Sequence, residues 1–384
     1  MVNNIEREDL DSVIVHLQQD DPKLTHGPKV REFEANWNSW LGSKYSVMVN
    51  SGASANDLSM LALKEIYGHG EVIVPPLTWV SDVASIIHAG LNPVFVDINL
   101  TNLSFDLGEL RKAINPNTRA IFITHVLGIN ALSDEILDLC KSMGIKLIED
   151  VCESHGATFK SKKVGTFGFA SNFSFYYAHH MTTIEGGMIS TDDEEFYETI
   201  RMMRSHGMTR EVNSGEFKQS LASTYPDLNS DFIFKYAAHN MRPNEINGIL
   251  GISQLPRLDK NIAKRTENFK VFLNNLDSNK FITTLLSEGS SNYAFPIILK
   301  KADQENVRKI ETLLKDSGIE FRRGLSGGGS QIRQPYLKKL IPGINPSEFP
   351  NMDHIHFNSW YVGNYPEIST SRVKELTELL NSAF

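Results

Sequence analysis

The chain has 384 residues, a formal net charge of −8 and 41% hydrophobic residues, a composition typical of a folded protein with room for more than one core. The acidic balance argues against a nucleic-acid-binding surface, because such a surface needs an excess of Lys and Arg. There is no run of about 18 apolar residues that could span a membrane. The polar, acidic beginning MVNNIEREDLDSV does not resemble a signal peptide, so we expect a cytoplasmic protein.

The cysteine content indicates no disulfide or metal-cluster chemistry. The chain contains only Cys140 and Cys152, which are too few for a disulfide framework or for a cluster held by four thiolates. We expect both to be free thiols buried in the fold.

The predicted elements fall into three parts along the chain. Residues 1–28 are predicted to form a helix and an arm rich in turn formers. Residues 29–250 are predicted to form a large α/β domain, because apolar runs alternate there with helical segments; this pattern indicates a mostly parallel sheet covered on both faces. Residues 251–384 are predicted to form a linker helix and a small α+β domain. The expected strands are YSVMV, EVIV, NPVFVDI, AIFITHV, IKLIED, FGFASNFSFYY, GGMISTD, NYAFPIILK and IEFRRG.

Ligands of parallel sheets bind at the carboxyl ends of the strands, and the first such end here leads into small residues. In NSGASAN, a strand passes into a helix so that the backbone N–H groups of Ala53 and Ser54 would face outward at the helix N-terminus. That arrangement suits a phosphate. The same residues also suit a plain turn with an N-cap, and the pattern alone leaves both open.

Two further strand ends carry candidate binding residues. Trp79, in PPLTW, suits either stacking on a flat ring or packing in the core. Asp150 ends the apolar strand IKLIED, and a carboxylate there needs a cationic partner, because burying it unpaired is costly. A protonated pyridine nitrogen would serve, and so would an arginine. Glu153, three residues on, could face the edge of the same ring.

Two adjacent histidines follow the strand FSFYY. Ser174 is placed to offer its hydroxyl to the same phosphate, and His179 comes five residues later on the loop that leaves the strand. His179 and His180 have no third or fourth ligand at a useful spacing, so we expect no metal site. An imidazole with an ordinary pKa of about 6.5 suits a base at neutral pH.

In this order the segments closely resemble the DegT/DnrJ/EryC1/StrS family of fold-type I pyridoxal-phosphate enzymes, which act on nucleotide-linked sugars. The resemblance covers nearly the whole chain. It includes SGASAN, PPLTWVSDVASIIHAGLNPVFVDI, IEDVCESHGA, FSFYYAHHMTTIEGGMIST, KYAAHNMRPNEINGILGISQL and FNSWYVGNYPEI. It implies an α/β fold-type I transferase fold with a large mostly parallel-sheet domain and a smaller C-terminal α+β domain. The implied cofactor is pyridoxal 5'-phosphate (PLP) or pyridoxamine 5'-phosphate.

The resemblance also implies a role for each matching position. Trp79 would stack on the cofactor ring, and Asp150 would pair with the pyridine nitrogen. Glu153 stands near the ring hydroxyl, where the aminotransferases usually have Gln. Asn240 would reach the phosphate of the neighbouring subunit, which implies a homodimer with shared active sites. The phosphate contacts within one subunit would come from Ala53, Ser54 and Ser174.

His179 is the departure from the family pattern. The aminotransferases have Lys at this position, which forms a Schiff base with the cofactor and moves a proton to the substrate carbon. Imidazole cannot anchor the cofactor in this way but can still accept a proton. The branch of the family with His here removes the C3 hydroxyl from nucleotide-linked 4-keto-6-deoxyhexoses, as in the colitose pathway. The resemblance therefore implies a lyase that uses L-glutamate to form pyridoxamine phosphate and releases a 3-deoxy-4-keto sugar for surface polysaccharides such as the lipopolysaccharide O-antigen.

Other interpretations remain open. A second dehydratase branch with His uses an iron–sulfur cluster, and the cysteine count excludes it. An aminotransferase whose Lys had been replaced by His179 would give the same sequence, and so would a non-catalytic cofactor-binding regulator. Arg322, Arg323 and Arg333 surround the loop GLSGGGS and are candidates for binding glutamate or the pyrophosphate of the substrate, or are solvated surface charges. The sequence does not identify the nucleotide or the hexose, and His180 has no assigned role.

Overall fold

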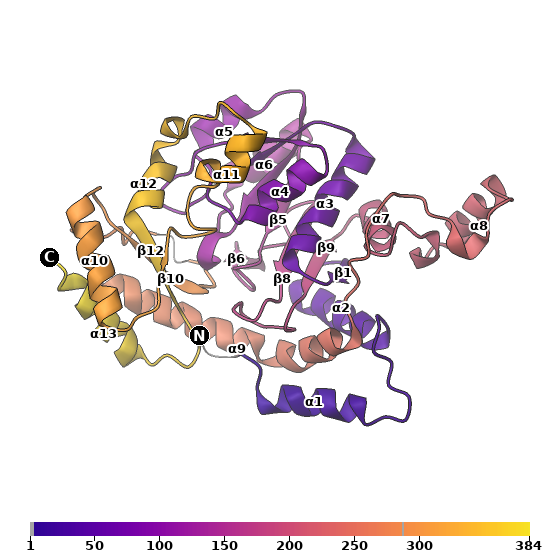
Figure 1. Cartoon of the computed structure of the whole chain (residues 1–384), viewed down its shortest axis with the longest axis horizontal. Coiled ribbons are helices and arrows are strands. Elements are labelled where there is room, and N and C mark those ends of the chain that lie inside the picture. Colours follow the sequence, from indigo (N-terminus) through magenta and orange to yellow (C-terminus); the bar gives the residue numbers. More distant parts are fainter. Residues whose placement is uncertain (1–3, 286–287) are drawn as a thin grey trace.

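A computed structural model describes residues 4–285 and 288–384, so the first three residues of the predicted N-terminal arm lie outside it. A seven-stranded sheet forms the centre of the molecule, in the order β1-β9-β8-β5-β4-β2-β3 (Figure 1). Neighbouring strands are parallel except where β9 pairs with β1 and β8. The strands are β1 (Tyr45–Val49), β2 (Glu71–Val74), β3 (Asn92–Phe95), β4 (Thr118–Thr124), β5 (Lys146–Asp150), β8 (Ala170–Ser174) and β9 (Gly187–Thr191).

Helices cover both faces of this sheet, because successive residues of each strand enter different cores. In β4, Ala120 and Phe122 pack under α3 and α4, whereas Ile121 and Ile123 pack against α2, α5 and α6. The predicted mostly parallel sheet covered on both faces is therefore confirmed. The helices of this part are α2 (Pro28–Leu41), α3 (Gly52–Tyr67), α4 (Val80–His88), α5 (Leu107–Ala113), α6 (Asp134–Met143) and α7 (Glu194–Arg204), and a short hairpin is formed by β6 (Thr158–Phe159) and β7 (Lys162–Lys163).

A smaller sheet, in the order β10-β12-β11, belongs to the C-terminal part. Its strands are antiparallel and pack with α9, α10 and α13 around a separate core that contains Phe269, Phe295 and Trp360. The long helix α9 runs beneath both sheets (Figure 1). The elements are α9 (Glu245–Asn275), β10 (Ala294–Ile298), α10 (Gln304–Asp316), β11 (Arg322–Arg323), α11 (Pro335–Leu340), α12 (Pro350–Asn358), β12 (Ser359–Gly363) and α13 (Thr370–Asn381). The predicted division at residue 250 falls inside α9 and stays a prediction.

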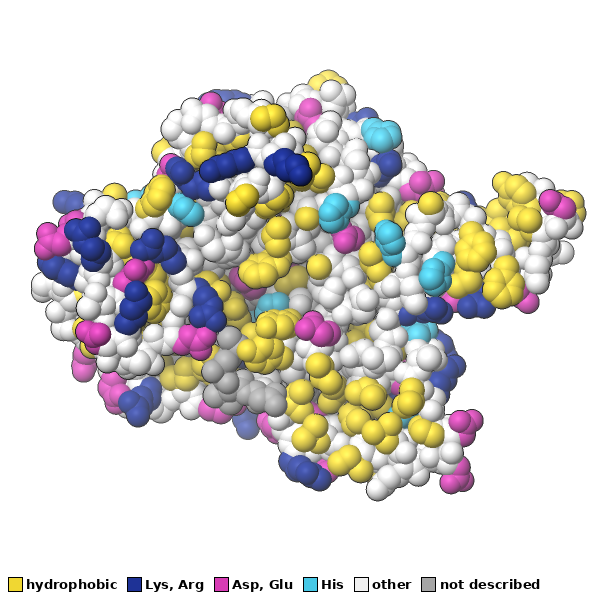
Figure 2. Space-filling model, viewed as in Figure 1, with side chains coloured by type: hydrophobic (Ala, Val, Ile, Leu, Met, Phe, Trp, Pro, Cys, Tyr) yellow, Lys and Arg dark blue, Asp and Glu magenta, His cyan; other side chains and the backbone are white. Residues whose placement is uncertain are grey.

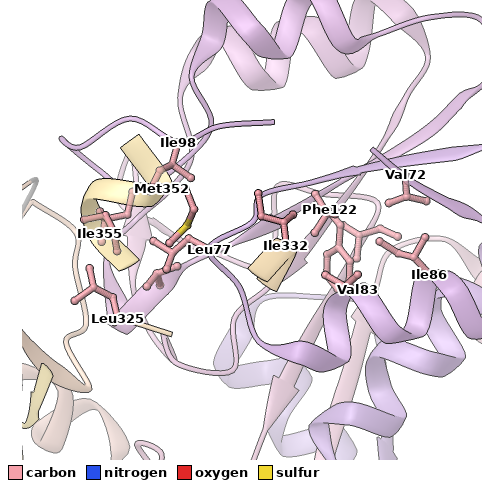
Figure 3. Close-up of a cluster of buried hydrophobic side chains, with 14 of the residues drawn as sticks. Val72, Leu77, Val83, Ile86, Ile98, Phe122, Leu325, Ile332, Met352 and Ile355 are labelled. Carbon is pink, nitrogen blue, oxygen red and sulfur yellow. The ribbon is translucent and has the colours of Figure 1, made fainter. Parts of the chain in front are cut away.

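The C-terminal part also shares a core with the large sheet (Figure 3). The shared cluster joins apolar residues of both parts, among them Leu77, Ile98, Phe122, Leu325, Ile332, Met352 and Ile355. Polar contacts accompany it, because Gln331 donates from its backbone N–H to Pro76 O over 2.9 Å and from its side chain to Thr78 O over 3.0 Å. The glycine-rich loop before Gln331 is thereby held against the segment that carries Trp79.

Two segments extend from the body. Helix α1 (Arg7–Leu17) packs along α9, and α8 (Gly215–Thr224) lies on an arm that projects away from the sheet (Figure 1). Short 3-10 helices are η1 (Val126–Gly128), η2 (Thr209–Glu211), η3 (Ser230–Phe232), η4 (Gln331–Arg333) and η5 (Pro346–Glu348). In the described part of the chain, no helix has the length and apolar character needed to cross a membrane.

Replacing Glu245 with Ala should destabilise the fold by about 2 kcal/mol. Glu245 is 1% exposed, and its carboxylate accepts from Lys29 N over 2.9 Å and Val30 N over 3.1 Å. These N–H groups begin α2, whose N-cap Gly27 offers no side chain. Urea unfolding measures the loss. Glu267→Ala is the control, because Glu267 pairs with Lys264 at the surface and should change stability by less than about 0.5 kcal/mol; equal midpoints for both variants would contradict the capping role.

Candidate active site

Three neighbouring strand ends put polar side chains on one face of the sheet. The register pairs Thr124 of β4 with Asp150 of β5, and Asp150 with Asn172 of β8. Side chains at paired positions of adjacent strands point to the same face, and this is the face covered by α3 and α4. Ser174 lies two residues beyond Asn172 and therefore points the same way. Thr124, Asp150, Asn172 and Ser174 together form the floor of the site.

The N-terminus of α3 opens beside this floor. Ser51 caps the helix by accepting from Ser54 N over 3.1 Å, which leaves the N–H groups of Gly52 and Ala53 without helical partners. A Cβ atom on Gly52 would lie 2.6 Å from Ser174 Cβ, so glycine is what lets the Ser174 hydroxyl approach the helix end. A helix N-terminus beside a hydroxyl suits an anionic phosphate.

These elements surround a cavity of about 410 Å³. The predicted residues that line it are Ala53, Trp79, Asp150, Glu153, Ser174, His179 and Arg322. Trp79 is 51% exposed at its wall, which fits a stacking residue better than a core residue. Seven residues from separate segments thus meet in one cavity, and their individual roles stay predictions.

Two other predicted cofactor residues lie outside the cavity lining. Ser54 donates from its backbone N–H to Ser51 and from its hydroxyl to Asn50 Oδ1 over 2.6 Å, so the cap already uses its polar groups. Asn240 is exposed, and its Oδ1 accepts from Arg242 Nε over 3.0 Å. The role predicted for Asn240 needs a second subunit and stays a prediction.

The three candidate arginines differ in their surroundings. Arg322 lines the cavity and pairs with Glu320 over 2.7 Å. Arg323 pairs with Glu311, which also accepts from Trp360 Nε1. Arg333 forms two hydrogen bonds with Asp353, of 2.9 and 2.6 Å. All three arginines therefore have a carboxylate partner in the chain, and Arg322 is the one that lines the cavity.

His179 is held in one orientation. Its Nδ1 lies 3.1 Å from Ser174 O, and a carbonyl oxygen can only accept, so Nδ1 carries the proton and Nε2 is the basic nitrogen. The segment is also fixed from behind, because Asn4 Nδ2 donates to His179 O over 2.6 Å. Burial lowers the pKa of His179 to about 4, against an opposing effect of Ser174 O and Asp150. The imidazole is therefore an unprotonated base at neutral pH.

Glu153 is an acid that burial keeps protonated. Its Oε2 accepts from Leu127 N over 2.8 Å. Burial raises its pKa to about 8; the bond from Leu127 N opposes this, and the nearby Asp150 adds to it. At pH 7 the side chain is mostly neutral and has one O–H to donate, so it can act in the same way as the Gln amide that the aminotransferases usually have there.

Sequence reasoning missed several lining residues. Tyr293 and Tyr361 contribute from the C-terminal part; burial raises the pKa of Tyr361 to about 12 and raises the pKa of Tyr293 well above its ordinary value, so both phenols stay protonated. The segments NYAFPIILK and FNSWYVGNYPEI contain them, but no local pattern places them at the cavity. Glu185 also lines the cavity.

His180 does not line the cavity. Its Nε2 lies 2.9 Å from Ser291 O and 3.0 Å from Ser291 Oγ, and the side chain is 1% exposed. This residue ties the loop to the start of the small sheet and serves the structure. Among the residues described, no three His, Cys, Asp or Glu side chains are grouped to hold a metal ion.

The cavity has two chemically different ends. The α3 N-terminus and Ser174 suit an anion, and Asp150 suits a cation; Trp79 and His179 line the same cavity. No lysine lines the cavity in the described part of the chain. The arrangement therefore fits a flat ligand with a phosphate at one end and a protonated ring nitrogen at the other, held without a covalent bond to lysine.

Comparison with known proteins gives concordant matches. The sequence matches the DegT/DnrJ/EryC1/StrS aminotransferase family over residues 3–381. It is 33% identical over 368 residues to the GDP-4-keto-6-deoxy-D-mannose 3-dehydratase of Yersinia pseudotuberculosis, covering 94% of this chain and 93% of that protein. A crystal structure of GDP-4-keto-6-deoxymannose-3-dehydratase with a trapped PLP–glutamate geminal diamine is similar, with a TM-score of 0.88, 31% identity and coverage of 99% and 98%. An aminotransferase of Helicobacter pylori, involved in the biosynthesis of pseudoaminic acid, has a TM-score of 0.84, 25% identity and coverage of 99% and 97%.

Replacing Glu153 with Gln should stabilise the protein without cofactor at alkaline pH. The raised pKa means that folding favours the protonated form, so stability is lost as pH rises from about 4.5 to about 8. Gln cannot ionise and still accepts from Leu127 N. Relative to the unsubstituted protein, the variant should gain about 3 kcal/mol at pH 9, allowing for partial exposure, and little at pH 4.5. Chemical unfolding at both pH values measures this, and an equal gain at both would rule out an ionising Glu153.

Proposed function

The chain belongs to the DegT/DnrJ/EryC1/StrS aminotransferase family and has its fold-type I architecture, and from this we propose that it is a PLP-dependent lyase. The reaction removes the C3 hydroxyl of a nucleotide-linked 4-keto-6-deoxyhexose, with L-glutamate as the amino donor. The products are the 3-deoxy-4-keto sugar, 2-oxoglutarate and ammonia. The observation that carries the proposal is His179, a fixed unprotonated base in a cavity whose described lining contains no lysine.

The cavity residues fit the cofactor. The N–H groups of Gly52 and Ala53 and the Ser174 hydroxyl would hold the phosphate, Trp79 would cover the ring, and Asp150 would face the ring nitrogen. When bound, the cofactor supplies an amino group for the C4 ketone and a conjugated ring that accepts electrons. Gly52 packs so closely against Ser174 that no larger residue fits at this position, and this close approach supports the assignment.

His179 is proposed to take a proton from the reacting carbon next to the cofactor amine. Its Nε2 has a free lone pair because Nδ1 donates to Ser174 O. A lysine at this position has a long flexible side chain that can return the proton to the sugar C4, which completes amino transfer. The imidazole is shorter and is held by its hydrogen bond, so return of the proton is disfavoured and loss of the C3 hydroxyl is favoured.

Relatives indicate the substrate to test first. The dehydratase of Yersinia pseudotuberculosis and the dehydratase of known structure are both named for GDP-4-keto-6-deoxymannose, and the latter structure contains a glutamate adduct of PLP. We take GDP-4-keto-6-deoxy-D-mannose as the proposed sugar and L-glutamate as the proposed amino donor. Arg322 is the cavity cation available to a carboxylate or a phosphate.

A homodimer with shared sites is part of the proposal. The arm around α8 exposes the apolar side chains of Tyr225, Leu228, Phe232 and Phe234 (Figure 2). A projecting arm with exposed apolar residues suits burial against a second copy. Asn240 lies near the base of this arm, which fits a residue donated to the neighbouring site. The cytoplasmic location predicted from the sequence remains a prediction.

The test is turnover of defined sugars. The purified protein, PLP and L-glutamate are incubated with GDP-, CDP- and dTDP-linked 4-keto-6-deoxyhexoses, and products are followed by mass and by ammonia release. We expect loss of the C3 oxygen with one ammonia per sugar. A 4-amino sugar as the sole product would establish an aminotransferase instead, and no turnover of any sugar would favour a regulatory protein.

Cofactor attachment gives an independent prediction. Borohydride reduction of the resting protein with PLP should leave no cofactor bound to the chain after denaturation, because His179 forms no reducible Schiff base. His179→Lys should give covalent cofactor on Lys at that position, detected by mass of the modified peptide, and serves as the positive control. His179→Asn should keep non-covalent binding but lose at least 100-fold in dehydration rate. Covalent PLP on a lysine of the unsubstituted protein would contradict the role given to His179.

A further inference from the structure

Asp82 is a buried carboxyl group that the proposed reaction does not yet use. It lies in the first turn of α4 and is 0% exposed. Asn56 Nδ2 donates to its Oδ1 over 2.6 Å. Thr124 Oγ1 donates to its Oδ2 over 3.0 Å, and the Thr78 hydroxyl donates to the same oxygen. Asp150 is close by, because Thr124, which donates to Asp82, is paired with Asp150 in the register of β4 and β5, and the two carboxyl groups interact.

Two neighbouring carboxylates in a buried site repel each other unless one of them keeps a proton, and the proton then lets one carboxyl donate to the other. The side chains that donate to Asp82 are those of Asn56, Thr78 and Thr124, and all three are uncharged. Burial first, and the charge of Asp150 second, raise the pKa of Asp82 well above its ordinary value. The threonine hydroxyls oppose the shift without cancelling it.

We propose that Asp82 is a positioning residue that keeps one proton and donates it to Asp150, so that Asp150 presents a single, fixed negative charge to the ring nitrogen of the cofactor. The inference rests on the cofactor of the proposed function. The site then contains a second carboxyl group. Asp82 and Asp150 together set the charge on the floor of the cavity.

Charge matching gives the physical reason. Two ionised carboxylates would put two negative charges against one protonated ring nitrogen, at a large cost in a buried site. One shared proton reduces this to a single charge. Cys152 and Tyr336 are titratable groups that interact with Asp82, and burial raises the pKa of each, so both are neutral at pH 7 and leave the balance unchanged.

A chain of hydrogen bonds fixes the direction of the pair. Asn56 accepts from Asn172 Nδ2 over 2.9 Å, and Asn172 accepts from the Ser59 hydroxyl over 2.7 Å. Because Asn56 also donates to Asp82, the orientation of Asp82 is determined by side chains on α3 and β8. Asp82 is thus fixed by several hydrogen bonds, and such fully bonded networks are rigid.

The experiment compares Asp82→Asn with Asp82→Leu in the Glu153→Gln background, which removes the other cavity acid that titrates near neutral pH. Asn keeps a donor for Asp150 but cannot ionise, whereas Leu keeps the size and offers no donor. PLP affinity is measured from its absorbance between pH 7 and 9.5, and thermal stability without cofactor over the same range. Neither readout involves a sugar, so a failure of dehydration leaves the test of Asp82 intact.

We expect Asp82→Asn to bind PLP within threefold of its parent at pH 7 and to show a flatter dependence of affinity on pH. The raised pKa of Asp82 makes the parent lose stability as pH rises, so the unfolding temperature of Asp82→Asn should exceed that of the parent by an amount that grows with pH. Asp82→Leu should weaken PLP binding at least tenfold.

Two outcomes would overturn the inference. Identical pH curves for parent and Asp82→Asn would show that Asp82 carries no titrating proton. Equal loss of PLP affinity in the Asn and Leu variants would show that donation to Asp150 is not its role. Asp97→Asn is the matched control, because Asp97 is another buried acid with a raised pKa but bonds to backbone N–H groups outside the cavity; it should alter stability and leave the PLP spectrum unchanged.

Discussion

The site depends on one constraint. Asp150 ends a buried parallel strand, so the negative charge of its carboxylate must be compensated there. Its strand pairs with β4 on one side and β8 on the other, so no solvent reaches the carboxylate from within the sheet. Every group on that floor is arranged around this charge. Asp82 shares a proton with it, Cys152 N donates to it over 2.8 Å, and the open side is left for a cation.

Burial changes the chemistry of the surrounding side chains in opposite directions, according to their type. It disfavours the charged form, so it raises the pKa of Glu153 and lowers that of His179. The acid becomes a donor and the histidine stays a base. If the same two residues stood at the surface, their protonation states would be reversed at mildly acidic pH. The Glu would be ionised and the His would be protonated.

Much of this could be predicted from the sequence, because strand ends are local signals. Asp150 and Ser174 end apolar strands, and Trp79 follows EVIVPP, so the sequence indicates strand ends for all three, and all three line the cavity. The arginines show the limit, since the pairs Arg323–Glu311 and Arg333–Asp353 depend on how distant segments pack. Tyr293 and Tyr361 enter through the C-terminal part, whose approach no local pattern gives. Asp82 left no such signal, because an acidic residue in the first turn of a helix is common at the protein surface.

The same packing explains why the cavity is formed by two parts of the chain and still has fixed walls. Leu325 and Ile332 share a core with Leu77, and Gln331 bonds to the backbone of the segment that carries Trp79. The wall residue and the glycine-rich loop are therefore held together. Ser326 of this loop lines the same cavity as His179, so differences in this loop between relatives should change which nucleotide sugar is accepted while leaving the chemistry at the strand ends unchanged.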